Sequence, residues 1–450
     1  MELTAINRVY FVGIGGIGMS ALARYFAKRG AVVCGYDKTR TDLTIALERE
    51  GILISYLDDD ATLPVCFLDK NPDTLIVYTP AIPKGSAILN YFQQNGFALK
   101  KRSEVLGIIS KGQFCIAVAG THGKTTTSSI IAHLLTDTGY GCTAFLGGIA
   151  TNYGSNFLLS DKPVVVVEAD EYDRSFLTLH PDLAVITSMD ADHLDIYGDS
   201  MQLQESFRLF AGQLKAGGTL FLRSGLPISD GVTYSLDPWA DIKGLNIRVV
   251  EGCFEFDYTS NEVTIEGIKL TLPGRHNIEN AVAAIGVALK LGIDKEAIKQ
   301  ALRTFKGVKR RFETQVTGDK VYIDDYAHHP EELRACFAAV RELYPDKKLT
   351  VIFQAHLFSR TKDFAEDFAK VLSTVDELLL LDIYPARELP IPGIDAPFLL
   401  DQITLDQKMV CTKGQVIDLI KAKQPELLLT VGAGDIDTLV QPLKNLMSHA

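Results

Sequence analysis

The chain has 450 residues, of which 47% are hydrophobic and 22% are charged. This composition is typical of a soluble globular protein, and a chain of this length is expected to form about two to four domains, with three as the middle estimate. The formal net charge of −11 argues against nucleic acid as the main partner, because nucleic-acid phosphates bind to basic surfaces.

The cysteines and the hydropathy pattern indicate a cytoplasmic protein. The seven cysteines are an odd number, are widely scattered and never form a Cys-x-x-Cys pair, as is usual for reduced core residues. No stretch approaches the roughly 18 apolar residues of a membrane span, and the N-terminal residues lack the pattern of a secretory signal. We therefore expect no membrane insertion.

A glycine-rich loop follows the first expected strand. Residues 8–12 form an apolar run of strand length, Gly13–Gly18 has the pattern Gly-x-Gly-x-x-Gly, and residues 19–29 have helical spacing. A second strand is expected at 31–36, directly before Asp37. This is the fingerprint of dinucleotide binding, so an NAD-dependent oxidoreductase is one hypothesis.

The same loop also suits other diphosphates. A helix N-terminus that accepts the pyrophosphate of NAD accepts that of a nucleotide sugar as readily. The Pro-bounded loop at 78–83 follows a further strand and is placed to line the same pocket. The candidate diphosphate-binding residues are Gly13, Gly15, Gly16, Gly18, Asp37, Thr79 and Ala81.

A second loop, at 120–123, has the features of a phosphate-binding loop. It joins an apolar strand at 114–119 to a helix, so free N–H groups and the positive end of the helix dipole point at the ligand. Lys124 is placed to reach the β and γ phosphates of ATP, and the Thr125 hydroxyl to bind Mg²⁺. The glycines lie closer together than in the common Gly-x-x-x-x-Gly-Lys-[Ser/Thr] spacing. The expected ATP ligands are Gly120, Thr121, His122, Gly123, Lys124, Thr125 and Thr126.

Carboxylates and a histidine follow the next two expected strands. Glu168 ends the strand at 163–168 and begins an acidic cluster, and His193 lies among aspartates just after the strand at 183–187. Ligands collect at the carboxyl ends of parallel strands, and oxygen and imidazole donors suit a divalent cation. We predict Glu168 and His193 as metal ligands, together with Thr125.

The pattern changes in the following region. Short alternating strands at 249–258 and 262–272 predict an antiparallel hairpin layer. A helix is expected at 277–291. His276 and Asn277 stand at its start, where the Asn277 side chain can cap the helix.

A second alternation of strands and helices begins near residue 309 and predicts a third α/β domain. Its strands are expected at 321–325, 349–353, 377–382 and 427–431. Asp325 and His328 follow the first of these strands, and His356 and Arg360 follow the next. Arg360 carries the planar guanidinium that clamps a carboxylate through two hydrogen bonds.

Together these segments resemble the Mur ligase family, whose members use ATP to form amide bonds in bacterial cell-wall precursors. The motifs span nearly the whole chain in the order of the family: Gly13–Gly18, Gly120–Thr126, Glu168–Glu171, Asp192–Asp195, His276–Asn277, Arg310–Phe312, Asp324–Pro330 and Gly432–Asp435. The Gly-x-Gly-Gly-x-Gly start resembles in particular the member that adds L-alanine to UDP-N-acetylmuramate. That resemblance places UDP rather than NAD at the first loop.

The resemblance implies an α/β fold with three domains. A Rossmann-like N-terminal domain at 1–109 would bind the UDP-sugar. A central P-loop ATPase-like domain at 110–308, with the added hairpin layer, would bind ATP, and a Rossmann-like C-terminal domain at 309–450 would bind the amino acid. The implied reaction joins L-alanine to the carboxylate of UDP-N-acetylmuramate through an acyl phosphate and releases ADP and phosphate in peptidoglycan precursor synthesis. A monomer or weak homodimer is expected.

The resemblance also implies roles for single residues. Lys124 and Thr125 would contact ATP and Mg²⁺, and Glu168 and His193 would bind the metal. The further ATP contacts would be His276 and Asn277 near the adenine, Arg311, and Asp325 at the ribose. The amino-acid and reacting sites would be lined by His328, His356 and Arg360. The catalytic candidates are Lys124, His193, His328 and Arg360, with His193 or His328 as the general base.

This chain departs from its relatives at two positions. Many relatives have arginine directly after the histidine that matches His356, whereas this chain has Leu357, which leaves Arg360 as the carboxylate anchor. Several relatives bind a second Mg²⁺ with a carbamylated lysine at a place where this chain has residues 206–208, and no lysine follows before Lys215. We therefore expect no carbamate.

Other functions stay open from the sequence alone. An NAD-dependent oxidoreductase would explain the first loop only, and a P-loop switch or motor would explain the second loop only. A ligase explains both loops and the polar residues of the third region. Within the family, the alternative is the recycling ligase that attaches a murein peptide to the same UDP-sugar.

Overall fold

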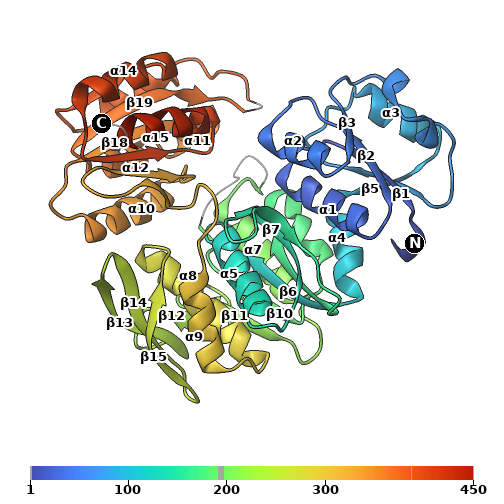
Figure 1. Ribbon diagram of the computed structural model, residues 1–450, viewed down its shortest axis with the longest axis horizontal. Coiled ribbons are helices and arrows are strands. Elements are labelled where there is room, and N and C mark those ends of the chain that lie inside the picture. The colour runs from blue at the N-terminus through green and yellow to red at the C-terminus, as the bar shows by residue number, and fades with distance from the viewer. Residues whose placement is uncertain (1–2, 191–196, 387, 449–450) are drawn as a thin grey trace. The chain divides into compact units, whose positions relative to one another are not determined.

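The computed structural model describes residues 3–190, 197–386 and 388–448 (Figure 1). The chain divides into two compact units, which we describe separately. The first unit comprises Met1–Leu245, Asp257–Ile268 and Glu279–Phe305, and the second comprises Asn246–Phe256, Lys269–Ile278 and Lys306–Ala450. Within the described residues, no helix combines the length and the apolar character that crossing a membrane requires.

The first unit begins with a five-stranded sheet in the order β3-β2-β1-β4-β5. All four pairings in it are parallel. Its strands are Arg8–Val12 (β1), Val32–Tyr36 (β2), Leu53–Ser55 (β3), Thr74–Tyr78 (β4) and Ala98–Lys101 (β5). Its helices are Ile17–Lys28 (α1), Asp42–Arg49 (α2), Ala87–Gln94 (α3) and Arg102–Lys111 (α4). The predicted βαβ unit around the first glycine loop is confirmed.

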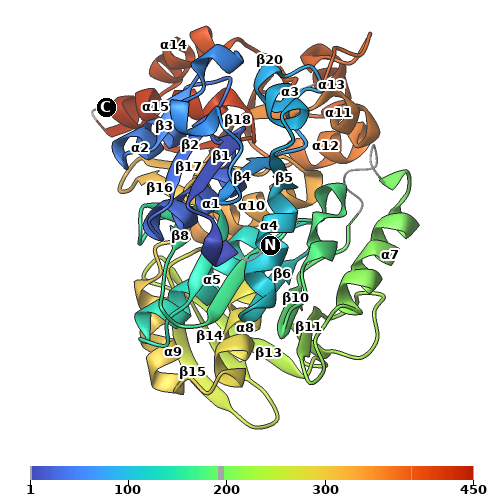
Figure 2. The same cartoon turned by 90° about the vertical axis from the view of Figure 1, so that its right-hand side faces the viewer.

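A larger sheet follows, with ten strands in the order β15-β14-β13-β12-β11-β10-β6-β9-β7-β8. The pairings from β12 to β7 are parallel, and β8 runs antiparallel to β7. The strands are Phe114–Ala119 (β6), Thr143–Ala150 (β7), Ser155–Leu158 (β8), Val164–Ala169 (β9), Leu183–Ile186 (β10), Thr219–Arg223 (β11) and Val232–Ser235 (β12). Helix α5 (Lys124–Asp137) packs over β6, β9 and β7, and α7 (Ser200–Ala211) packs on the 3₁₀ segment η4 (Tyr172–Thr178). Both helices are labelled in Figure 2, together with β6 and β10.

Three parallel neighbours at the centre of this sheet create the edge that carries the candidate site. Strands β9, β6 and β10 lie side by side, with Ala119 of β6 in register with Ala169 on one side and Ile186 on the other. Because both faces of such strands are covered, they are continuous apolar runs, which is why the sequence predicts them well. Their carboxyl ends therefore bring the loops after residues 119, 169 and 186 to the same edge.

The first sheet and the central sheet share one hydrophobic core. Helix α1 packs against β7 and β8, and the Tyr25 ring lies 5.6 Å from that of Phe145 and 6.3 Å from that of Phe157. The buried Arg24 side chain bonds to Asn156 of β8 and, through its Nη2, to Glu50 at 2.7 Å. Apolar burial and a paired buried charge thus join these two parts within the first unit.

The hairpin region differs from the prediction in its boundaries. The strands are Ile242–Val250 (β13), Cys253–Thr259 (β14) and Thr264–Leu270 (β15), so the single strand expected at 249–258 is wrong. Glu251 and Gly252 have φ values of 53° and 75° and form a tight two-residue turn inside that range. Two successive positive φ angles are typical of the turn that connects antiparallel strands.

Two helices follow the hairpin region. They are Arg275–Lys290 (α8) and Lys295–Thr304 (α9). The predicted start of the first helix at Asn277 is wrong by two residues. Asn277 lies in the first turn rather than at the cap, and its amide donates to the Pro273 carbonyl.

The second unit contains a six-stranded sheet in the order β16-β17-β21-β18-β19-β20. Only the β16–β17 pairing in it is antiparallel. The strands are Glu313–Val316 (β16), Val321–Asp325 (β17), Leu349–His356 (β18), Glu377–Tyr384 (β19), Lys408–Val410 (β20) and Leu427–Val431 (β21). The helices are Pro330–Leu343 (α10), Phe358–Asp363 (α11), Ala365–Leu372 (α12), Ala396–Gln402 (α13), Lys413–Lys423 (α14) and Val440–Ser448 (α15).

Candidate functional site

The loop between β6 and α5 requires glycine at two positions. Gly120 has φ 141° and Gly123, which precedes the helix, has φ 82°. A Cβ atom on Gly120 would lie 2.0 Å from Thr187 Oγ1, and one on Gly123 would lie 2.9 Å from Asn280 Oδ1. Both the backbone conformation and the close packing therefore exclude larger residues. The N–H groups at the start of α5 are left to face a ligand.

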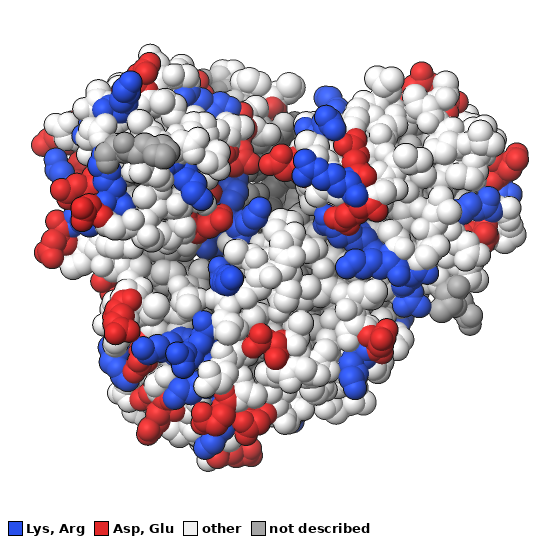
Figure 3. Space-filling view, viewed as in Figure 1, with Lys and Arg blue, Asp and Glu red and all other residues white. Residues whose placement is uncertain are grey.

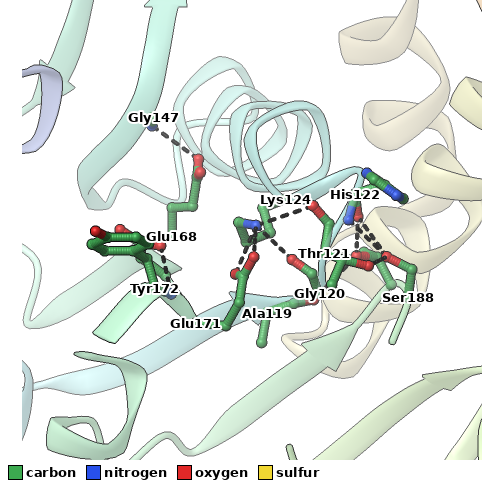
Figure 4. Close-up of polar contacts among 12 residues, drawn as sticks. Ala119, Gly120, Thr121, His122, Lys124, Gly147, Glu168, Glu171, Tyr172 and Ser188 are labelled. Carbon is green, nitrogen blue, oxygen red and sulfur yellow. Dashed lines mark hydrogen bonds and ion pairs between the residues drawn. The ribbon is translucent and has the colours of Figure 1, made fainter. Parts of the chain in front are cut away.

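Residues that follow β10 hold this loop in place. Ser188 Oγ accepts a hydrogen bond from the His122 N–H at 2.7 Å and lies 2.9 Å from Thr121 Oγ1. Thr187 donates to the His122 carbonyl oxygen and, at 3.1 Å, to that of Ala119. The contacts of Ser188 with Thr121 and His122 are drawn in Figure 4. The loop is thus fixed by the neighbouring strand before any phosphate binds.

Lys124 lies in a buried ion pair beneath the loop. Its Nζ is 2.8 Å from Glu171 Oε2 and 3.0 Å from Oε1, and it donates to the Gly120 carbonyl at 2.6 Å (Figure 4). Burial lowers the pKa of Lys124, but the carboxylates of Glu171, Glu168 and Asp170 outweigh burial and hold the pKa above its usual value. Burial raises the pKa of Glu171 to about 7, against the opposing charge of Lys124. Lys124 is therefore a fixed positive charge at the phosphate loop.

Two of the predicted metal ligands, Thr125 and Glu168, are in hydrogen-bond contact. The Thr125 hydroxyl donates to Glu168 Oε1 at 3.1 Å, and Glu168 Oε2 accepts from the Gly147 N–H at 3.0 Å. A Cβ atom on Gly147 would lie 2.2 Å from that oxygen, so the close approach requires glycine. A hydroxyl and a carboxylate are hard oxygen donors of the kind Mg²⁺ prefers. His193 lies outside the described residues, and among the described ones no three His, Cys, Asp or Glu side chains form a metal-binding group.

Lys215 is engaged at the opposite edge of the sheet. Its Nζ lies 2.7 Å from Asp182 Oδ2 and 3.0 Å from the Gln113 carbonyl, both of which precede strands of the central sheet. The side chain is therefore held away from the carboxyl edge, where Glu168 lies.

The first glycine loop contacts the other residues predicted with it. Gly13 has φ 90°, and a Cβ atom there would lie 2.7 Å from the Thr79 methyl carbon. The Gly15 N–H donates to Asp37 Oδ2 at 2.7 Å. The Ala81 N–H lies 3.5 Å from Thr79 Oγ1. The loop after β4 and the residue after β2 thus converge on the N-terminus of α1.

An aromatic and cationic cluster forms at the carboxyl edge of the sheet in the second unit. The His328 and His356 rings meet edge to face at 5.7 Å, and the His356 ring stacks on Tyr384. Arg360 Nη1 lies 3.4 Å from His356 Nδ1. Leu357 has φ 72° and precedes α11. The structure therefore brings together the two residues predicted for amino-acid binding, His356 and Arg360, and the catalytic candidate His328.

Asp325 holds the segment that enters this sheet. Its Oδ2 accepts from the Phe312 N–H at 2.6 Å, and its Oδ1 accepts from the Ala327 N–H at 2.7 Å. The Arg311 guanidinium lies over the Tyr326 ring at 5.0 Å. Burial raises the pKa of Asp325 to about 6, against the charge of Arg311. The predicted ribose ligand thus already binds two backbone groups.

From the two partly buried histidines, His276 and His328, we expect acid to destabilise the fold. Burial lowers the pKa of His276 to about 4 and that of His328 to about 3, while an exposed histidine has about 6.5. The unfolded chain takes up protons below that value and the folded chain does not, so the free energy of unfolding contributed by these rings falls as pH is lowered from about 7 to 5.

Urea unfolding at both pH values, on wild type and a His276→Asn/His328→Asn variant, measures this contribution. The buried carboxyls Glu171 and Asp325 act with the opposite sign, because their pKa values are raised, and the variant retains them. We expect the variant to lose less stability on acidification than wild type. Equal losses would contradict the assignment.

Sequence reasoning missed several residues of these clusters. Arg102 pairs with Asp170 at 3.1 Å and would touch a Cβ on Gly18. Glu171 belongs to the acidic cluster after β9, but nothing in the sequence distinguishes it from its acidic neighbours as the partner of Lys124. Glu332 approaches His328 from α10, one helical turn further along the chain.

Comparison with known proteins was made for the whole chain. Three family models match in order: Mur ligase family, catalytic domain, at residues 8–114, Mur ligase middle domain at 118–288, and Mur ligase, glutamate ligase domain, at 310–434. The UDP-N-acetylmuramate--L-alanine ligase of Christiangramia forsetii is 49% identical over 449 residues, which cover 100% of this chain and 99% of the relative. That of Flavobacterium psychrophilum is 52% identical over 445 residues, 99% of each chain.

A solved structure agrees with these relatives. The crystal structure of UDP-N-acetylmuramate-alanine ligase from Thermotoga maritima superposes with a TM-score of 0.83 at 26% sequence identity and covers 98% of this chain and 100% of that chain. The predicted three-domain α/β fold is thereby confirmed. Because the family models cover most of the chain and relatives near 50% identity match its full length, the chain belongs to the Mur ligase family of ATP-dependent amide-forming ligases.

Proposed function

We propose that this chain joins L-alanine to the carboxylate of UDP-N-acetylmuramate in peptidoglycan precursor synthesis, with ADP and phosphate as products. The observation that carries the proposal is the full-length match to relatives of that activity at about half identity. The phosphate loop with its buried Lys124 supports it, since such a loop has no task in an oxidoreductase. The enzyme acts in the cytoplasm as a monomer or weak homodimer.

Each predicted domain has one main ligand in this proposal, and the C-terminal domain also supplies the predicted ATP contacts Arg311 and Asp325. Residues 1–109 bind the UDP-sugar at the first glycine loop, residues 110–308 bind ATP, and residues 309–450 bind L-alanine. The expected boundary after residue 109 falls in the last turn of α4. Mg²⁺ is held by Thr125, Glu168 and His193, and when bound it supplies positive charge that stabilises the transferring phosphoryl group.

The nucleotide contacts divide between phosphate and nucleoside. The loop N–H groups and Lys124 bind the phosphates, because they lie at the N-terminus of α5, where the helix dipole is positive and the groups are already in place before the ligand binds. The nucleoside contacts are His276, Asn277, Arg311 and Asp325. Arg360 binds the alanine carboxylate, since the residue is buried and its Nη1 lies 3.4 Å from Nδ1 of His356, whose ring contacts that of His328.

The reaction proceeds in two steps on these residues. The muramyl carboxylate attacks the γ phosphorus of ATP, and Lys124 stabilises the charge that develops on the transferred oxygens. The alanine amine then attacks the acyl carbon and phosphate leaves. The amine must first lose a proton, which requires a base near the amino-acid site.

Phosphate release tests this function directly. Purified protein with ATP, Mg²⁺ and UDP-N-acetylmuramate should release phosphate when L-alanine is added. Glycine, L-serine and the murein tripeptide are offered in separate reactions. Faster release with the tripeptide than with L-alanine would instead support the recycling ligase.

Ligand-induced thermal shifts separate the UDP-sugar from NAD. A ligand that binds the native state at 100 times its Kd stabilises it by about 2.7 kcal/mol. UDP-N-acetylmuramate should therefore raise the melting temperature, while NADH at the same concentration leaves it unchanged. A shift with NADH and none with the UDP-sugar would return the first loop to the dinucleotide hypothesis.

A further inference from the structure

Glu332 is a nearly buried carboxylate that contacts His328 in two ways. It lies in the first turn of α10 and is 13% exposed. Its Oε2 accepts a hydrogen bond from the His328 backbone N–H at 2.9 Å and lies 3.3 Å from the ring nitrogen Nδ1 of the same residue. Its Oε1 is 3.9 Å from Arg311 Nη1. One carboxylate thus joins two residues predicted for different ligands.

The surroundings of His328 determine where its proton sits. Nδ1 lies 3.0 Å from the Tyr326 carbonyl oxygen as well as 3.3 Å from Glu332. Both neighbours only accept hydrogen bonds, so a neutral ring carries its proton on Nδ1. The lone pair then belongs to Nε2. Burial lowers the pKa of His328 to about 3, so the ring is neutral at physiological pH.

We propose that Glu332 is a positioning residue that holds His328 as the Nδ1-protonated tautomer, so that Nε2 accepts the proton of the amino-acid substrate. The inference rests on the proposed function, in which the alanine amine must lose a proton near the amino-acid site, and it assigns that proton to His328. It extends that function by naming the carboxylate that orients the histidine base. Carboxylates that orient a histidine and stabilise its charged form are a general device in catalysis.

The proton balance of the step is complete. The ammonium of L-alanine gives one proton to Nε2 of His328, and the resulting amine forms the C–N bond at the acyl carbon. The C–O bond to phosphate breaks, and the second proton lost by nitrogen leaves with the phosphate. The imidazolium that forms lies next to the Glu332 carboxylate, which stabilises it, and then releases its proton to solvent.

The charges around His328 make its basicity depend on substrate. After burial, Glu332 acts to raise the pKa of the ring, whereas Arg360 and His356 act to lower it. A substrate carboxylate bound to Arg360 offsets that positive charge. Binding of the amino acid therefore makes His328 a stronger base at the time its amine needs one.

The test compares Glu332→Gln with a matched control. Glutamine keeps the size of the side chain and an oxygen that accepts from the His328 N–H, but it has no charge. The control is Glu331→Gln, one position away on the same helix, where the carboxylate is 52% exposed and pairs with Arg334. We expect Glu332→Gln to lower kcat with L-alanine by about 10²-fold, the lower end of general-base effects, with an unchanged KM for ATP. Glu331→Gln should match wild type.

Hydroxylamine distinguishes a base from a merely structural role. Its nitrogen is already unprotonated at neutral pH, so it traps the acyl phosphate as a hydroxamate without a base. Hydroxamate formation should be equal in wild type and Glu332→Gln. A parallel loss with both nucleophiles would mean that Glu332 only maintains the fold, and would overturn the proposal.

Two further measurements complete the test. The first is NMR of protein labelled with ¹⁵N-histidine, in which the His328 signals are identified by their loss in His328→Asn. These signals should show a protonated Nδ1 in wild type and in Glu331→Gln. In Glu332→Gln the fraction of rings protonated on Nδ1 should be smaller. This experiment needs no substrate, so it holds even if the proposed function fails. In kinetics, adding Glu332→Gln to His328→Ala should cost nothing further. Protonated Nε2 in wild type, or additive losses, would overturn the inference.

Discussion

Replacement of Lys124 by alanine is expected to lower turnover by about 10³-fold, at the upper end of the effect of removing one preorganised donor. Lys124 is the charged side chain that the structure fixes at the phosphate loop, between the Gly120 carbonyl and Glu171. Its charge stabilises the oxygens of the γ phosphate as the phosphoryl group moves to the muramyl carboxylate. Initial rates of L-alanine-dependent phosphate release measure the loss.

The same change also affects stability, and a second variant separates the two effects. Lys124→Ala leaves Glu171 buried without its partner charge, and such a break costs about 3–5 kcal/mol. Glu171→Gln removes that unpaired charge. The double variant should therefore unfold at a higher urea concentration than Lys124→Ala and remain as inactive. Recovery of activity together with stability would show that Lys124 serves the fold and not the phosphoryl transfer.

Replacement of Glu168 by glutamine is expected to raise the Mg²⁺ concentration needed for half-maximal activity by at least about tenfold. Loss of a residue that only contacts a metal ligand already lowers metal affinity by about this factor, so loss of a ligand should cost no less. Glu168 is the carboxylate that meets the Thr125 hydroxyl at the carboxyl edge of the central sheet. Glutamine has nearly the same size but lacks the negative charge that a divalent cation requires. A titration of activity with Mg²⁺ at saturating ATP measures the shift.

Asp161→Asn provides the control for this titration. Asp161 is exposed and precedes the other end of β9, so its change alters net charge without reaching the carboxyl edge. Its Mg²⁺ dependence should equal that of wild type. The same titration for His193→Ala tests the third predicted ligand, and added bicarbonate should rescue neither variant. An unaltered Mg²⁺ requirement in Glu168→Gln would remove that residue from the metal site.

The charge of the molecule is consistent with small anionic ligands. Over the face drawn in Figure 3, basic and acidic side chains are interspersed. A nucleotide does not need an extended basic surface, because a few N–H groups and one fixed cation at a helix N-terminus bind its phosphates. The phosphate loop provides such groups through Gly120, Gly123 and Lys124.

The sequence determined the loops that follow buried parallel strands. Strands β1, β6 and β17 have their predicted bounds, because strands covered on both faces are continuous apolar runs and a glycine or polar loop marks where each one ends. The loop at Gly120 and Gly123 was predicted from its glycines, because a phosphate loop needs their conformational freedom. By contrast, the turn at Glu251 and Gly252 was missed, since a two-residue turn interrupts an alternating pattern only briefly.

The partners of Lys124 and of the phosphate loop were decided by tertiary structure alone. Lys124 pairs with Glu171, which lies 47 positions away, and Ser188, 66 positions from His122, fixes the loop. No local pattern selects Glu171 over its acidic neighbours, because the register between β9 and β6 and the burial beneath the loop set which carboxylate reaches the lysine. Glu332, by contrast, is a local partner of His328: the histidine lies in the loop after β17, and α10 begins two positions after it, which brings the carboxylate back to the ring four positions along the chain. Side-chain type and spacing therefore predicted which chemistry is present, while strand order and burial decided which charged and polar groups face one another at the phosphate loop.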